Sequence, residues 1–163
     1  MDRGAFDELM ASDDPAMAVV TVAAGGERSG CLVGFHGQSS IEPPRYCVWL
    51  SKANHTYGVA LEATHVAVHF LTAGDHELAR IFGSLTGDEV DKFDLVEWHP
   101  GPDGVPLLDG CPHGLAGAKD AVLDAGGDHV MVAIDPTSAW TAGSFTPLRL
   151  SDVTDVEPGH PAD

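Results

Sequence analysis

A lysine, an asparagine and a threonine alternate along residues 52–56, and together their side chains could hold a phosphate group. Lys52 supplies a positive charge, while Asn54 and Thr56 supply polar hydrogens beside a predicted helix start. The N-terminus of a helix adds unpaired backbone amides and a favourable dipole. The same residues also fit a plain helix cap at Asn54 next to a solvated lysine. Their spacing alone leaves both interpretations open.

Other common arrangements for chemistry find less support in the sequence. Neither G-x-G-x-x-G nor G-x-x-x-x-G-K-[ST] occurs, so a nucleotide would have to be held without a Rossmann or P-loop cradle. No G-x-S-x-G elbow supports a hydrolase. His65 and His69 have the spacing of a metal pair on a helix, but in the predicted strand they would lie about 13 Å apart. Cys111 and His113 lack a second ligand pair, so the sequence favours no metal site.

The elements that must position these residues are mostly short strands. Apolar runs predict strands at residues 17–23, 28–35, 46–50, 65–71, 116–123, 129–134 and 147–150. Residues 65–71 alternate as a half-buried strand would, with Val66, Val68 and Phe70 on one face. Helices are predicted at residues 5–11, 55–63 and after Asp75, and a loop at residues 37–40. This pattern favours a mainly β fold, an antiparallel barrel with a few helices, over a doubly wound sheet.

Composition limits the partners and the compartment. The formal charge of −17 would repel nucleic acid and an anionic membrane surface, and no apolar run approaches the length of a membrane span. Three cysteines without C-x-x-C spacing and the absence of a leader-like start suggest a cytoplasmic protein. We expect a single domain over residues 1–153 and a frayed acidic tail over residues 154–163.

Several motifs, taken together in their order, resemble the flavin reductase-like domain of the FMN-binding split-barrel superfamily. The resemblance covers about residues 14–134. The matching elements are the run at 18–22, Gly30, Ser40-Ile41-Glu42-Pro43-Pro44, Asn54-x-Thr56, Leu78-Ala79 with Phe82, Asp91-Lys92-Phe93, the run at 104–108 and Gly127-Asp128-His129. The resemblance implies a six-stranded antiparallel Greek-key split barrel that forms a homodimer. It also implies FMN, or FAD, bound near the dimer interface and reduced by NAD(P)H, with a partner oxygenase as one destination for the reduced flavin.

The same resemblance suggests roles for individual residues. His129 would lie on the nicotinamide side, and Lys52, Asn54 and Thr56 would lie toward the phosphate. Lys92 and Phe93 would lie near the cofactor. The isoalloxazine ring would be lined, largely through main-chain groups, by Leu32, Val33, Gly34, Phe35, Gln38, Ser39 and Ser40.

This chain departs from the family pattern where the ring would bind. Members usually carry a Thr-Ala-x-Ser-Phe type of run, and here it reads Leu32-Val33-Gly34-Phe35-His36, without the two hydroxyls.

The resemblance as a whole gives the main hypothesis, an NAD(P)H-dependent flavin reductase. The first alternative is a flavin-binding or carrier module without turnover. The second is a split barrel that binds another planar cofactor, a deazaflavin or haem, the latter through His36 or another exposed imidazole.

Overall fold

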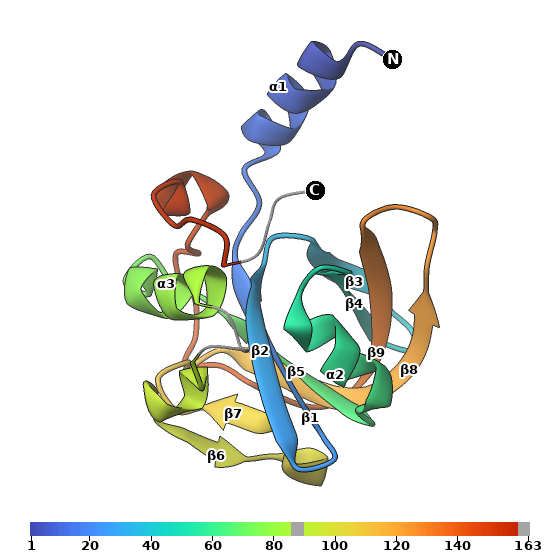
Figure 1. Cartoon of the computed structure of the whole chain (residues 1–163), viewed down its shortest axis with the longest axis vertical. Helices are drawn as coiled ribbons and strands as arrows, with labels where there is room; N and C mark the ends of the chain where they lie inside the picture. The colour runs from blue at the N-terminus through green and yellow to red at the C-terminus, as the bar shows by residue number, and fades with distance from the viewer. Residues whose placement is uncertain (86–89, 160–163) are drawn as a thin grey trace.

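A curled, fully antiparallel sheet forms the body of the protein. The computed structural model describes residues 1–85 and 90–159. The sheet has seven strands in the order β2-β1-β5-β8-β9-β4-β3 (Figure 1). These strands are β1 (Ala18–Ala24), β2 (Glu27–Val33), β3 (His36–Ser40), β4 (Arg45–Ser51), β5 (His65–Phe70), β8 (Gly114–Leu123) and β9 (His129–Trp140). A separate hairpin pairs β6 (Trp98–Pro100) with β7 (Pro106–Leu108).

The predicted mainly β, antiparallel fold with a few helices is confirmed as a curled half-barrel, but the expected count of six strands is wrong, because this sheet has seven. Residues 37–40, predicted as a loop, lie in strand β3, where Gly37 pairs with Cys47 and Gln38 with Tyr46 of β4. Strand β3 is at the edge of the sheet, so its polar side chains reach solvent while its backbone pairs on one side. The predicted strand at residues 147–150 forms only two isolated bridges, Thr72 with Pro147 and Ala16 with Arg149.

Three α-helices and three short 3₁₀ turns accompany the strands in the described part of the chain. They are α1 (Arg3–Asp13), α2 (His55–Glu62), α3 (His76–Ser84), η1 (Lys92–Asp94), η2 (Pro102–Gly104) and η3 (Leu150–Val153). Helix α2 lies within the curl of the sheet and contacts β1 and β2, whereas α3 packs against β2 (Figure 1). As predicted, Asn54 caps α2: its side-chain oxygen accepts a hydrogen bond from the Thr56 amide.

Two apolar clusters lie on opposite sides of the sheet. The inner cluster includes Val20, Val48 and Val68, and the second includes Phe82 and Leu148. Strand β5 is buried on both faces, not half-buried as predicted, because β7 and Trp140 cover the face that carries Ala67 and His69.

His69 is a buried structural residue in this arrangement. Its side chain is completely inaccessible to solvent. The Leu108 amide donates to Nε2 at 3.1 Å, so Nδ1 carries the proton and donates to the Val19 carbonyl at 3.1 Å. Burial lowers the pKa of His69 from 6.5 to about 4. His69 therefore links β5 to β1 and β7 as a neutral imidazole.

The two ends of the described chain differ in packing. Helix α1 stands away from the sheet and buries none of its residues (Figure 1). After η3 the chain returns to α3, where the Gly159 amide donates to the Gly83 carbonyl and Val156 packs on the second cluster. The rest of the predicted tail, residues 160–163, lies outside the described residues, as do residues 86–89. Among the described helices, none has the length and apolarity needed to cross a bilayer.

Candidate functional site

The ends of β4 and β9 meet the connection between β2 and β3 at one exposed corner. The Trp49 amide donates to the Phe35 carbonyl at 2.9 Å, and Ser51 pairs with His129 across the two strands. The rings of Phe35 and His129 are edge to face, with centroids 5.0 Å apart. Because Phe35 is 57% exposed, it presents an aromatic surface to solvent beside an imidazole.

The start of α2 lies at the same corner. The Lys52 amide donates to the Asp128 carbonyl at 2.9 Å, which ties the residues before α2 to the turn between β8 and β9. The Lys52 ammonium forms an ion pair with Asp124 at 2.9 Å. The structure thus brings Phe35, Lys52 and His129 together from three separate parts of the sequence.

Thr56 lies in this region but faces inward. Its hydroxyl is 2.9 Å from that of Ser29 and its side chain is buried. It also hydrogen-bonds the thiol of Cys31, whose pKa burial raises to about 11. Asn54 uses its side-chain oxygen as the helix cap. Of the three residues predicted to lie toward a phosphate, Lys52 is therefore the one with a charged group at the exposed corner.

The five-residue turn at 124–128 contributes two carboxylates to the site. Asp128 contacts Nδ1 of its neighbour His129 at 2.8 Å. The hydrogen bond from His129 lowers the pKa of Asp128, and the hydrogen bond from Lys52 lowers that of Asp124. Both carboxylates are therefore ionised at neutral pH, next to the side chains of Lys52 and His129.

A cavity of about 800 Å³ opens on the other side of Phe35. Its walls come from Gly34 and Phe35 in the β2–β3 connection, from Trp49 of β4, and from Phe6 and Met10 of α1. The volume lies within the usual range for small-molecule sites, roughly 300–1,000 Å³. Aromatic side chains form much of the sheet side, so a flat apolar group could lie there.

His36 is among the residues that line this cavity, and Leu32 and Val33 precede it at the end of β2. All three side chains are turned into the protein. Val33 belongs to the inner cluster and Leu32 packs on the second. The ring nitrogens of His36 lie 2.7 Å from the Tyr46 hydroxyl and 2.6 Å from the Ala16 carbonyl, and burial lowers its pKa. Neither nitrogen of His36 is left for a metal, which removes the support for haem ligation by this residue.

Gln38, Ser39 and Ser40 are carried away from Lys52 by strand β3. Ser40 lies opposite Arg45, at the start of β4, whereas Lys52 follows the end of that strand. Seven residues of extended chain separate the two points by about 23 Å. The structure therefore places Ser40 at the opposite end of β3 from Phe35 and the corner, and Gln38 in the middle of that strand.

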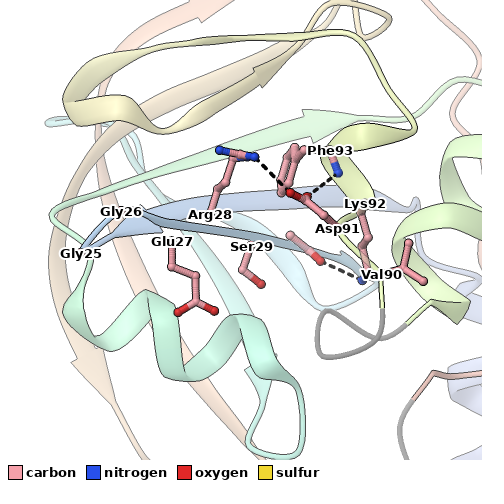
Figure 2. A pocket seen from close by; sticks show the side chains of 10 residues that line it. Gly25, Gly26, Glu27, Arg28, Ser29, Val90, Asp91, Lys92 and Phe93 are labelled. Carbon is pink, nitrogen blue, oxygen red and sulfur yellow. Dashed lines mark hydrogen bonds and ion pairs between the residues drawn. The ribbon is translucent and has the colours of Figure 1, made fainter.

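Lys92 and Phe93 lie at a different place. Lys92 donates to the carbonyls of Gly30 and Phe82 at 3.0 and 3.1 Å, and burial lowers its pKa. Phe93 packs edge to face on Phe82 and Trp98. Figure 2 shows the two residues among those that line a separate cavity, together with the β1–β2 turn and β2. The volume of this cavity is about 360 Å³. Nothing in these contacts brings them to the corner of Phe35 and His129.

Sequence reasoning missed Trp49, Asp124 and Asp128 as part of this corner. The alternation of β4 could have indicated Trp49, because Val48 and Leu50 on either side are buried and therefore point inward. Asp128 precedes His129 directly, so it too was within reach of the sequence. Asp124 was not, because only the folded turn brings it to Lys52.

Comparisons with known proteins agree with this architecture. The flavin reductase like domain matches residues 14–152 of the chain. The reductase subunit HsaB of a flavin-dependent monooxygenase from Mycobacterium tuberculosis is 31% identical over 134 residues, covering 77% of this chain and 70% of its own. A stachydrine N-demethylase reductase subunit, Stc3 from Rhizobium meliloti, is 27% identical, and the alignment spans 54% of its length.

Solved structures share the fold over nearly the whole chain. A flavin reductase domain protein from Arthrobacter sp. FB24 superposes with a TM-score of 0.81 at 23% identity, covering 99% of this chain and 98% of its own. An NADH:FAD oxidoreductase from Streptomyces globisporus, SgcE6, gives a TM-score of 0.75 at 26% identity, with 90% and 93% coverage. The match to residues 14–152 covers most of the sequence. This chain therefore belongs to the flavin reductase like domain family.

Proposed function

We propose that this protein is a flavin reductase that transfers hydride from NAD(P)H to FMN. The observation that carries the proposal is the meeting of Phe35, Lys52 and His129 at one exposed corner of a flavin reductase fold. Relatives named FMN reductase (NADH) include SmoA of Agrobacterium fabrum, 27% identical over 127 residues. Family membership supports the class of reaction, and the corner supports its location.

The residues of the corner fit a flavin in part. The exposed ring of Phe35 and the neighbouring apolar cavity suit the isoalloxazine, and Lys52 is a cation within the same surface. When bound, the flavin would supply the hydride acceptor. The protein would stack the two rings at close distance, exclude water and place His129 at the nicotinamide side. Such a reaction needs no general base from the protein.

Titration of the purified protein with FMN, followed by visible absorbance, tests the proposal. We expect saturable binding at micromolar FMN and oxidation of NADH or NADPH by the loaded protein. His129→Ala should slow the reduction while leaving FMN affinity nearly unchanged, because its ring contacts Phe35 at the edge of the corner. Absence of any flavin binding would refute the proposal, and an unchanged reduction rate would remove His129 from it.

A flavin-binding module without turnover is the second candidate. It is favoured by the side chains at Leu32 and Phe35, which lack the hydroxyls usual in the family, and by the carboxylate that engages His129. Backbone amides could still hold the ring, but each missing side-chain hydrogen bond weakens binding by about 0.5–1.5 kcal/mol. Rapid oxidation of NAD(P)H by the FMN-loaded protein would eliminate this candidate.

We also propose that the protein forms a homodimer through the outer face of β4, β9 and β8. Trp49, Met131 and Leu123 pair directly across the three strands, so their side chains share this face. Trp49 is 36% exposed and Leu123 56% exposed. An antiparallel sheet whose outer face meets water normally alternates apolar and polar residues. This row breaks that rule, as expected for a face covered by a second copy.

Sedimentation velocity tests the homodimer. Trp49→Glu should convert the dimer to a monomer, whereas Ile41→Glu should not, because Ile41 lies in the turn between β3 and β4 and is 84% exposed. A wild-type monomer at high protein concentration would refute the interface.

We propose further that the protein acts in the cytoplasm and that its reduced flavin passes to a separate oxygenase, as the names of the reductase-subunit relatives suggest.

A further inference from the structure

One short turn engages both functional side chains of the corner. Asp124 lies 2.9 Å from the Lys52 ammonium, and Asp128 lies 2.8 Å from Nδ1 of His129. The turn is itself fixed: the Gly126 amide donates to Asp124 at 2.8 Å, and the Lys52 amide donates to the Asp128 carbonyl. Gly126 has a φ of +92°, a conformation that glycine adopts readily. Asp124 is therefore held toward Lys52 by its own turn.

This geometry affects the charge of the ligand that the corner accepts. A phosphate monoester carries about −1.5 to −2 charges at neutral pH. To reach Lys52 it must displace the Asp124 carboxylate or share the ammonium with it at close range. The turn also holds Asp128 beside Lys52: the Lys52 amide donates to the Asp128 backbone carbonyl, and the charge of Lys52 helps to lower the pKa of the Asp128 carboxylate. The whole chain, at −17, adds no attraction for an anion.

The geometry points to Asp124 as a specificity-determining residue that lowers the affinity for phosphate-bearing FMN relative to uncharged riboflavin. This inference rests on the proposed function, since it assumes that the flavin phosphate lies at Lys52. Riboflavin has the same ring and no phosphate, so it would leave the Lys52–Asp124 pair intact. The pair is partly exposed, with 37% of the lysine side chain and 49% of the aspartate side chain accessible. A partly exposed ion pair is weak, so we expect Asp124 to lower the affinity for FMN only modestly, about fivefold.

Affinities of FMN and riboflavin, measured by quenching of flavin fluorescence, test this inference without relying on turnover. Asp124→Asn keeps the shape of the side chain and removes its charge, so it should tighten FMN binding about fivefold and leave riboflavin unchanged. Lys52→Met should weaken FMN much more than riboflavin. The matched control is Asp120→Asn, which removes the same charge from β8, where Asp120 pairs with Arg45 at 3.6 Å.

The possible outcomes separate the inference from the proposed function. An equal effect of Asp124→Asn on both flavins, or an equal gain in FMN affinity from Asp120→Asn, would overturn the role of Asp124. Equal weakening of both flavins by Lys52→Met would move the phosphate away from Lys52 and overturn it as well. If no variant binds either flavin, the proposed function itself fails, and the inference fails with it.

Discussion

Mild acid should destabilise this protein through His69, well above the pH at which carboxylates titrate. In the folded chain both ring nitrogens are used: Nδ1 donates to the Val19 carbonyl and Nε2 accepts from the Leu108 amide. Protonation would place a hydrogen on Nε2 against the Leu108 N–H, inside a site closed to water. Burial thus lowers the pKa of His69 from 6.5 to about 4.

Proton uptake by His69 determines the direction of the pH effect. Between the pKa of 6.5 in the unfolded chain and about 4 in the folded chain, the unfolded chain binds a proton that the folded chain does not bind. Stability therefore falls as the pH is lowered through this window. The folded-state value of about 4 implies a loss of about 2 kcal/mol between pH 7 and pH 5, and about 3 kcal/mol in total. The aspartates with lowered pKa values, such as Asp14 and Asp155, lose their contribution only at lower pH.

Urea denaturation at several pH values measures this loss. His69→Gln should remove the part of the loss in unfolding free energy between neutral and mildly acidic pH that His69 causes. An amide can donate and accept hydrogen bonds at similar positions, but it does not titrate. The matched control is His76→Gln, since His76 is exposed and pairs with Asp155 on the surface. Should His69→Gln fold poorly, ¹⁵N chemical shifts of the wild-type imidazole report its protonation directly. A His69 that protonates near its ordinary pKa in the folded protein would refute the reasoning.

Two further predictions concern the packing around β2. Gly30→Ala should destabilise the fold by about 1–3 kcal/mol, because a β-carbon there would lie 2.9 Å from Phe82 and 3.1 Å from the Val20 carbonyl. Gly37→Ala is its control, with nothing within 4 Å, and equal urea midpoints for the two variants would contradict the prediction. Lys92→Met should lower the free energy of unfolding by about 1–3 kcal/mol because it leaves two buried carbonyls without a donor. A variant as stable as the wild type in the same assay would show that those carbonyls find other donors.

The local pattern of the sequence was sufficient for much of the fold. Runs of apolar residues located β1, β2, β4, β5, β8 and β9, and Asn54 marked the start of α2. These signals are local, because strand alternation and helix capping depend on residues only a few positions apart. The edge strand β3 lacked such a signal, since its residues are polar and its pairing with β4 defines it.

The placement of the candidate site depended on contacts that the sequence does not contain. Lys92 and Phe93 matched a family motif, yet their side chains are used to join β2, α3 and η1 in the second cluster. Ser39 and Ser40 share a segment with Phe35, but an extended strand carries them away from it. Motif order along the chain says which residues are near in sequence, whereas strand direction decides which are near in space.

The sequence by itself determined an antiparallel β fold, the capped helix after Lys52 and the resemblance to flavin reductases. Only the tertiary structure decided that the ring of Phe35 contacts that of His129 and that Asp124 forms an ion pair with the Lys52 ammonium. The physical reason is that element type follows from short-range periodicity, while these contacts depend on the register of β4 on β9 and on the folded turn at 124–128. Register depends on the hydrophobic patterns of both paired strands, and β4 and β9 lie far apart in the sequence, so neither strand alone specifies it.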